Sequence, residues 1–387
     1  MRDFTYHAPT EVIFGRGAEL QTGQVARKYG ANRVLVVYGQ GSVVRSGLLD
    51  RVCKTFEEAG ISYRLLGGVE PNPCLGFARD GVKTAIDMKA DMVVGVGGGS
   101  VIDTAKAIAH GAANPDIDIW DFWLRKQTVM KSIPVGAVLT IPAAGSEMSD
   151  SAVLTDEETQ EKRGLSTRFN RPAFAIMNPE LAATLPVFQV ACGVTDIYMH
   201  TLERYFSPVT GNDFTDEVAE ALMRVVIRNG IRAVKDPTDY DAMSEIMWCS
   251  SVSHNGITGL GGEKDFSAHQ LGQAIGGIYD KAHGATLSAV WGSWAWYVYK
   301  TDPARFGEYA RNVFGVGTAE AGIEKTIEFF KELGMPVCFS ELGIGVLSDA
   351  ELEALAVKCT YGKTRTIGCF RVLDYDDILN IYKAANR

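Results

Sequence analysis

The segment Ala90-Asp-Met-Val-Val-Gly-Val-Gly-Gly-Gly-Ser-Val-Ile-Asp-Thr-Ala-Lys-Ala-Ile-Ala109 decides the fold of the first half of this chain. Residues 90–96 read as a buried strand, residues 97–100 as a glycine turn and residues 101–109 as an amphipathic helix. Glycines at such a turn let phosphate oxygens approach backbone N–H groups, and the helix N-terminus adds partial positive charge. The segment therefore predicts a pyrophosphate cradle. It lacks the Rossmann pattern Gly-x-Gly-x-x-Gly, so a plain tight turn is the alternative.

Similar strand patterns lie on both sides of this segment. A β-branched run at 34–38 ends in Gly39-Gln-Gly-Ser42 and precedes a helical pattern at 48–56. Further strand-like runs occupy 62–66, 133–141 and 173–177, and a hairpin-like stretch occupies 151–158. Strands that alternate with helices predict a mainly parallel α/β sheet, whose ligands bind beyond the carboxyl ends of the strands.

The character of the chain changes near Thr184, after which strand-like runs vanish. Helical patterns then occupy 191–206, 215–234, 240–252, 269–276, 285–299, 303–313, 319–333 and 349–358. A length of 387 residues exceeds what one core usually serves. We therefore expect an α/β domain over residues 1–184 and an all-α domain over residues 185–387.

A candidate metal site lies within the helical half. The chain has six histidines, and three of them, His200, His269 and His283, fall with Asp196 between residues 193 and 284. Asp196 and His200 are four apart and so share a helical face. One carboxylate and three imidazoles suit a divalent metal such as Fe²⁺ or Zn²⁺, which ligand type alone does not separate. An isolated pair of this spacing is more often a surface or capping pair.

His269 and His283 cannot bind one ion from a single straight helix, because fourteen residues span about 21 Å. The chain must fold back between them, and we expect the break at Gly276-Gly277 and Tyr279-Asp280. The remaining histidines, His7, His110 and His254, are interpreted as structural because none has a second ligand nearby in sequence.

Composition excludes several classes of function. A formal net charge of -9 without a basic cluster argues against nucleic acid as a partner. Seven cysteines, none in a Cys-x-x-Cys pair, indicate reduced thiols and a cytoplasmic protein. We expect no membrane association, because the N-terminus lacks an apolar signal core and no window approaches the roughly 20 apolar residues that span a bilayer.

Taken together, these motifs resemble the iron-containing (group III) alcohol dehydrogenase family over nearly the full length. Residues 97–106 look like its nucleotide signature, and residues 193–203 and 269–283 look like its two metal signatures. The resemblance implies the dehydroquinate synthase-like fold, with an N-terminal dinucleotide-binding α/β domain and an all-α C-terminal domain. Within the family, the chain is most similar to butanol dehydrogenases and NADPH-dependent aldehyde reductases.

The resemblance also assigns site residues. Asp196, His200, His269 and His283 are implied to hold the metal and to act in catalysis through it. The implied nucleotide-binding residues are Gly39, Gly41, Ser42, Asn72, Gly97, Gly98, Gly99, Ser100, Asp103, Thr140, Ser146, Ser151, Lys162 and Leu181. For Thr140 and Leu181, the alternative to nucleotide binding is ordinary packing in the core. Members that prefer NAD commonly carry an aspartate where this chain has Gly39. The turn Gly39-Gln-Gly-Ser42 has no nearby acid, so we expect NADP(H) rather than NAD(H).

Two departures from the family pattern stand out. The loop Pro142-Ala-Ala-Gly-Ser-Glu147 is shorter than in many members, and Gln273 replaces a common second histidine. Gln273 shares a helical face with His269, so we expect it beside the metal, where it cannot serve as an acid.

The implied activity is metal-assisted hydride transfer between a nicotinamide and a short or medium-chain aldehyde or primary alcohol, with a homodimer as the implied assembly. Three alternatives stay open: a same-fold lyase of the dehydroquinate synthase type, a metal-free maleylacetate reductase and a non-catalytic nucleotide-binding protein. Gln273 is the feature that favours the last of these.

Overall fold

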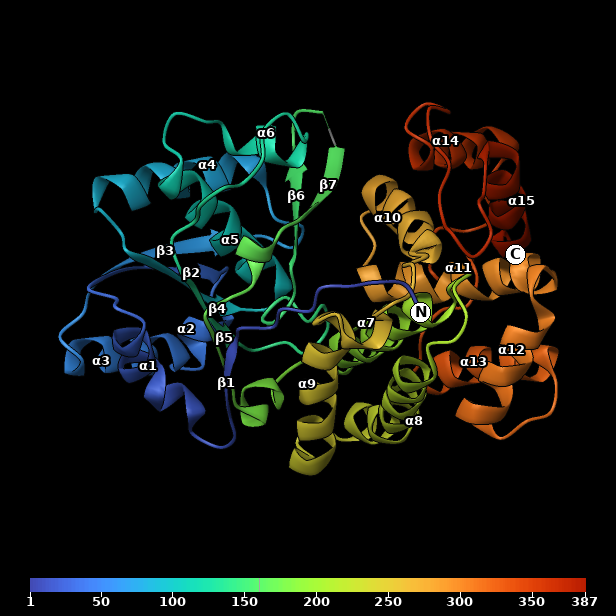
Figure 1. Cartoon of the computed structure of the whole chain (residues 1–387), viewed down its shortest axis with the longest axis horizontal. Helices are drawn as coiled ribbons and strands as arrows, with labels where there is room; N and C mark the ends of the chain where they lie inside the picture. The colour runs from blue at the N-terminus through green and yellow to red at the C-terminus, as the bar shows by residue number, and fades with distance from the viewer. Residues whose placement is uncertain (160) are drawn as a thin grey trace. The chain divides into compact units, whose positions relative to one another are not determined.

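The computed structural model (Figure 1) describes residues 1–159 and 161–387, which form two compact units. One unit is His7–Thr184, and the other is Leu185–Arg387 together with Met1–Tyr6. The first residues join the second unit through backbone contacts: the Arg2 N–H donates to the Gly261 carbonyl at 2.9 Å, and the Met1 ammonium donates to the Thr210 carbonyl at 2.9 Å.

A parallel six-stranded sheet forms the centre of the first unit. Its strand order is β1-β8-β5-β4-β2-β3, and every neighbouring pair is parallel. The bounds are β1 Glu11–Phe14, β2 Arg33–Gly39, β3 Ser62–Val69, β4 Met92–Gly97, β5 Val135–Leu139 and β8 Phe174–Met177. A separate antiparallel hairpin pairs β6 Ser151–Asp156 with β7 Glu161–Ser166. The α/β fold expected from the sequence is confirmed.

Helices cover both faces of this sheet (Figure 1). They are α1 Thr22–Lys28, α2 Ser42–Arg45, α3 Leu48–Glu58, α4 Leu75–Asp87 and α5 Gly99–Ala113. The short helix α6 Ile119–Trp123 packs instead against α4, α5 and the β6–β7 hairpin. Alternate side chains of β2 explain the arrangement: Val34 and Val36 belong to a core cluster with α1 and α3, whereas Leu35 and Val37 belong to one with α4 and α5. A strand buried on both faces needs the continuous apolar run that the sequence supplies.

The strand order creates a switch point between β2 and β4. From β2 the chain passes through α3 to β3 on one side, and from β4 it passes through α5 to β5 on the other. Since α3 and α5 pack on opposite faces, the ends of β2 and β4 are where a crevice forms in such sheets. The two glycine turns, at Gly39–Ser42 and Gly97–Ser100, follow these two strands.

The second unit is helical. Its helices are α7 Val187–Tyr205, α8 Asp213–Lys235, α9 Tyr240–His254, α10 Ser267–Tyr279, α11 His283–Val298, α12 Pro303–Tyr309, α13 Ala319–Glu332, α14 Asp349–Cys359 and α15 Tyr375–Ala385, with a π-helical turn at Ala310–Phe314. Helices α7 and α11 are buried on nearly all sides, as helices at the centre of a bundle must be. Trp291 and Trp294 of α11 are core residues, whereas Trp296 is partly exposed. Within the described residues, no helix combines the length and apolarity needed to cross a membrane.

Some expected boundaries were wrong. Gly276 and Gly277 do not break the chain, because α10 runs through both and ends at Tyr279. The reversal comes at the other expected position, Tyr279-Asp280, where Asp280 adopts the left-handed conformation with φ of 48°. The elements β1, α1, α4, α6 and α15 were not predicted from the sequence. Strand β1 has only four residues at the sheet edge, and α4 contains two glycines after a proline-rich turn, so their local signals are weak.

Candidate functional site

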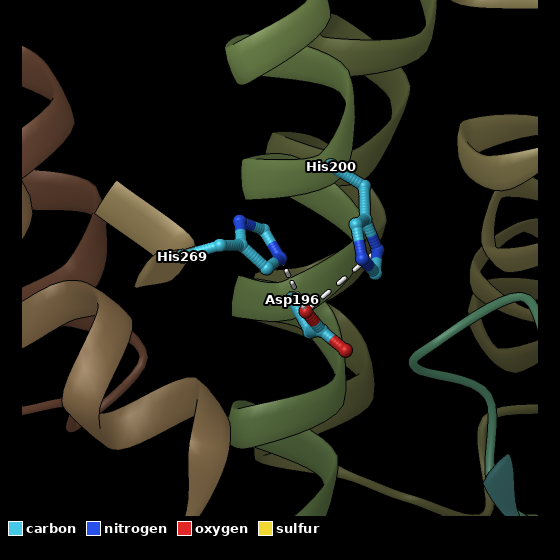
Figure 2. Close-up of side chains that lie close together, drawn as sticks. All are labelled: Asp196, His200 and His269. Carbon is cyan, nitrogen blue, oxygen red and sulfur yellow. Dashed lines mark ion pairs between the residues drawn. The ribbon is translucent and has the colours of Figure 1, made fainter. Parts of the chain in front are cut away.

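Asp196, His200 and His269 form the centre of a buried cluster in the helical unit (Figure 2). Asp196 and His200 lie one turn apart on α7, and His269 comes from the first turn of α10. Their ligand atoms all lie within 4.8 Å of one another. The Asp196 Oδ1 atom is 3.7 Å from His200 Nδ1 and 3.4 Å from His269 Nε2. The predicted juxtaposition of these three side chains is present in the structure.

His283 joins the same carboxylate from α11, of which it is the first residue. Its Nε2 atom lies 3.6 Å from Asp196 Oδ1. The next residue, Gly284, makes this approach possible: a Cβ there would lie 2.3 Å from the carbonyl oxygen of Cys192, one turn before Asp196 on α7. Only glycine lets α11 begin this close to α7, so the chain reversal brings the fourth predicted ligand to the cluster.

The donor set fits a divalent cation. A tetrahedral ion with metal–ligand distances of about 2.1 Å separates its ligand atoms by about 3.4 Å, close to the 3.4–3.7 Å between Asp196 Oδ1 and the three ring nitrogens. The group whose ligand atoms all lie within 4.8 Å of one another is Asp196, His200 and His269, without His283. His200 Nδ1 and His269 Nε2 are buried and make no hydrogen bond within the described residues. Leaving such atoms unsatisfied costs about 1–3 kcal/mol each, and an ion would satisfy both.

The two buried imidazoles have opposite electrostatic surroundings. Burial, reinforced by the neighbouring His254 and His269, lowers the pKa of His200 well below its ordinary value. Burial also disfavours charge on His269, but the carboxylates of Glu203 and Asp196 outweigh it and raise the pKa of His269 to about 9. A metal ion that binds here would therefore meet a neutral His200 but would have to displace a proton from His269.

Exposure distinguishes His283 from the other three predicted ligands. The side chains of Asp196, His200 and His269 are each 6% exposed, whereas that of His283 is 34% exposed. A small molecule therefore reaches the cluster most easily on the His283 side. Gln273 lies half-buried in α10 one turn after His269.

The sequence reasoning missed two neighbours of the cluster. Glu203, fully buried on α7, accepts hydrogen bonds from His269. Its spacing of seven from Asp196 places it on the same helical face, which was the available signal. His254, interpreted as structural, lies with its ring centroid 4.2 Å from that of His200. Nothing in sequence predicted this contact, because the two residues belong to different helices.

In the α/β unit, the expected nucleotide residues follow the carboxyl ends of the strands. Gly97, Gly98, Gly99 and Ser100 join β4 to α5. Gly98 occupies the N-cap position and leaves α5 without a side-chain cap. A Cβ at Gly98 would approach the Ile141 side chain to 3.1 Å, and one at Gly99 would approach Ala144 to the same distance. The turn therefore packs tightly against Ile141 and Ala144 and begins a 15-residue helix. The N-terminus of such a helix is a favourable place for an anion.

Asp103 and Ser146 lie in a network that locks the loop after β5 onto α5. The Asp103 carboxylate accepts hydrogen bonds from the Ser146 hydroxyl and, at 2.8 Å, from the Val153 N–H. The fully buried Lys106 ammonium donates to Ser146 Oγ and to the Ser151 carbonyl, both at 2.7 Å. Burial lowers the pKa of Lys106, while Asp103 opposes that shift. Three expected nucleotide residues thus fix one another around a residue that was not singled out.

Other expected nucleotide residues also come together. The Lys162 ammonium of β7 donates to Asn72 Oδ1 at 2.8 Å, although ninety positions separate them in sequence. Thr140 follows β5 and donates its N–H to the Gly97 carbonyl at 3.0 Å. Leu181 packs against the core cluster under the sheet.

The turn after β2 differs from expectation in one respect. Gly39 ends the strand, Gly41 has φ of 130° and Ser42 begins α2. The sequence suggested that no acid lies near this turn, which is wrong. The Gln40 amide donates to Glu70 Oε1 at 3.5 Å, because β2 and β3 are neighbours and Glu70 directly follows β3.

The family model for iron-containing alcohol dehydrogenases matches residues 9–179, and the model for the C-terminal part of the Fe-containing alcohol dehydrogenase family matches residues 190–386. The chain is 37% identical to NADH-dependent butanol dehydrogenase A of Clostridium acetobutylicum, with 99% of both chains covered. It is 33% identical to the NADPH-dependent aldehyde reductase YqhD of Escherichia coli, with both chains covered completely.

The fold is similar to that of solved structures. The structure of NADH-dependent butanol dehydrogenase A from Thermotoga maritima superposes with a TM-score of 0.95 at 33% identity, covering 100% of this chain and 99% of that one. The structure of Escherichia coli YqhD superposes with a TM-score of 0.92 at 32% identity and the same coverage.

Proposed function

This chain belongs to the iron-containing alcohol dehydrogenase family, and from that premise we propose that it catalyses metal-dependent, nicotinamide-linked reduction of a short or medium-chain aldehyde to its primary alcohol. The observation that carries the proposal is the convergence of three imidazoles on one oxygen of Asp196. The reverse reaction, alcohol oxidation, uses the same groups.

Asp196, His200, His269 and His283 would hold the cation in the helical unit. When bound, a divalent metal supplies Lewis acidity that stabilises negative charge on the substrate oxygen during hydride transfer. The three ligands with little exposure keep water from most of the cluster, and the more exposed His283 marks the side where the aldehyde enters.

The glycine turn at 97–100 would bind the cofactor pyrophosphate at the start of α5. Lys106 and Asp103 hold the loop after β5 against α5 through hydrogen bonds to Ser146 and Val153. The turn at Gly39–Ser42 would bind the adenosine ribose, because it follows the strand on the other side of the switch point. Asn72 and Lys162 would line the same edge.

Gln273 would donate a hydrogen bond near the reacting oxygen without transferring a proton, because an amide does not titrate. The proton that completes the alcohol would then come from water or a ribose hydroxyl.

Two residues decide the cofactor preference. Gly39 supports NADPH, since it leaves the turn itself without a carboxylate that would repel a 2′-phosphate. Glu70 beside Gln40 acts in the opposite direction. The relatives include proteins named for NADH and for NADPH. We propose preference for NADPH, limited by Glu70, and Glu70→Gln is expected to increase it.

The proposal extends to the assembly and the location of the protein. A homodimer is proposed from the family resemblance, and light scattering on the purified protein measures it. A cytoplasmic location is proposed from the cysteines, all seven of which are free thiols in the structure.

The proposal is tested by measuring transfer of deuterium from the cofactor to the aldehyde. NADPH and NADH carrying deuterium at the transferred C4 position are incubated with butanal and the metal-loaded protein, and the products are identified by mass spectrometry. The proposal predicts butanol with one deuterium at C1. Oxidation of neither cofactor, with butanal unchanged, contradicts it and leaves a lyase or a binding protein as the better account.

A further inference from the structure

Glu203 is a buried carboxylate close in sequence to Asp196 and His200, and the proposed chemistry does not use it. It follows Asp196 and His200 on the same face of α7, and its side chain is completely inaccessible to solvent. Both of its oxygens contact His269. Oε2 accepts a hydrogen bond from the ring Nδ1, and Oε1 accepts one from the backbone N–H at 3.1 Å.

The start of α10 explains why this acceptor is needed. The residue at its N-cap position is Phe266, which has no side-chain oxygen and adopts φ of 51°, an unusual angle for an aromatic residue. The first N–H groups of any helix need acceptors from outside it. Asp265 serves Ser267 at 3.1 Å, and Glu203 serves His269. Glu203 thus caps α10 from a different helix.

The same contact determines how the ring of His269 is presented. A carboxylate oxygen only accepts, so the hydrogen atom in this bond belongs to Nδ1. The lone pair available for coordination is then on Nε2, the atom that lies 3.4 Å from Asp196 Oδ1. With backbone and ring held by one carboxylate, His269 has little freedom to turn away from the cluster.

We propose that Glu203 is the positioning residue of the metal site, which fixes the tautomer and orientation of His269 through its two hydrogen bonds. The inference rests on the proposed function for its metal but not on turnover. A merely structural role, joining α7 to α10, would affect folding stability and leave the ligand geometry unchanged.

The test is Glu203→Gln, which keeps size and shape but replaces one acceptor oxygen by an NH2 group. In the same position its single oxygen meets only one of the two N–H groups of His269, and the NH2 group faces the other. Glu220→Gln is the matched control: Glu220 is also buried in the helical unit, and it accepts from Tyr205 and Asn312 at 2.8 Å each, without contacting the cluster.

The readout is titration of the metal-free full-length proteins with Co²⁺, followed by the visible absorption of the bound ion. Glu203→Gln is expected to bind Co²⁺ about 10–100-fold more weakly and with an altered spectrum, whereas Glu220→Gln matches the wild type. Wild-type affinity and an unchanged spectrum in Glu203→Gln overturn the proposal.

If Glu203→Gln does not fold, ¹⁵N-histidine NMR of the zinc-loaded wild type decides. The proposal predicts a proton on Nδ1 of His269, and a proton on Nε2 overturns it. These measurements do not require catalysis. If Glu203→Gln binds Co²⁺ more weakly but the wild type shows no turnover, the dehydrogenase proposal fails and the role of Glu203 stands. If the wild type turns over normally but Glu203→Gln binds Co²⁺ as the wild type does, the role of Glu203 fails and the dehydrogenase proposal stands.

Discussion

The two candidate sites of this chain are built from different parts of the polypeptide. The candidate nucleotide site is made mainly of backbone, in turns at the ends of β2 and β4. The metal cluster is made of side chains from three helices, α7, α10 and α11. A backbone site depends on glycines and strand order, whereas a side-chain site depends on helix packing. Substitutions that damage one site should therefore leave the other intact.

The largest expected effect is at the metal cluster. Asp196→Asn removes the negative charge on which three imidazoles converge, and we expect the rate of aldehyde reduction to fall at least about a thousandfold, with loss of bound metal. Metal content by mass spectrometry and NADPH oxidation measure both. Binding of NADPH, followed by fluorescence, should be unchanged. The exposed Asp213→Asn is the control on a helix of the same unit; equal metal content in both variants would refute the assignment.

The next effect is a loss of folding stability in acid. We expect it in the sheet unit, because α5 carries a buried histidine. His110 is buried there between Ser132 and Asn170, and burial lowers its pKa from 6.5 to about 4. Because the unfolded chain takes up this proton first, the stabilising contribution is present above pH 6.5 and is lost as the pH falls toward 4. We expect His110 to account for about 2 kcal/mol of unfolding free energy lost between pH 7 and pH 5.

Urea unfolding of the wild type and His110→Gln at both pH values, monitored by circular dichroism, measures this contribution. The variant should lose less stability on acidification. Equal losses in the two proteins would show that another group is responsible.

Cofactor preference provides a smaller effect at the candidate nucleotide site. Gly39 has room for a side chain, since its nearest neighbour would lie 3.6 Å from an added Cβ. Gly39→Asp is expected to shift the ratio of kcat/KM for NADPH over NADH toward NADH by about 10–100-fold, because the new carboxylate repels the 2′-phosphate. Gly39→Asn has the same size without the charge. A shift of equal size in Gly39→Asn would show that shape rather than charge is responsible.

The smallest expected effect is at the turn itself. Gly98→Ala adds a methyl group 3.1 Å from the Ile141 side chain, so the turn must shift and we expect about tenfold weaker NADPH binding. Co²⁺ binding should not change. Gly317→Ala is the control, since nothing lies within 4 Å of its added Cβ. Weakened Co²⁺ binding in Gly98→Ala would break the separation between the two sites.

The two sites also differ in how far sequence alone predicted them. The strand, turn and helix around Gly97 are encoded within twenty neighbouring residues, so the pattern predicted β4, α5 and the α/β class correctly. The contact between Gln40 and Glu70 was missed, because it depends on which strands are neighbours in the sheet.

At the candidate metal cluster, residue chemistry singled out four side chains that the structure brings together, but the supporting contacts were not predicted. Glu203 acts on a residue of another helix, so no local spacing reveals its partner. The glycine pair in α10 was a misleading signal, because tertiary packing keeps the helix intact through it. Gly284, which was not singled out, proved to be the glycine that the approach of α11 to α7 requires.

The most direct test of the central claim is reconstitution. The protein is stripped of metal, reloaded separately with Fe²⁺ and Zn²⁺, and assayed for NADPH and NADH oxidation with butanal. The account predicts no oxidation by the stripped protein and recovery with at least one metal, in the wild type but not in Asp196→Asn. Full activity of the stripped wild type would contradict it, because the convergence on Asp196 would then have no part in the reaction.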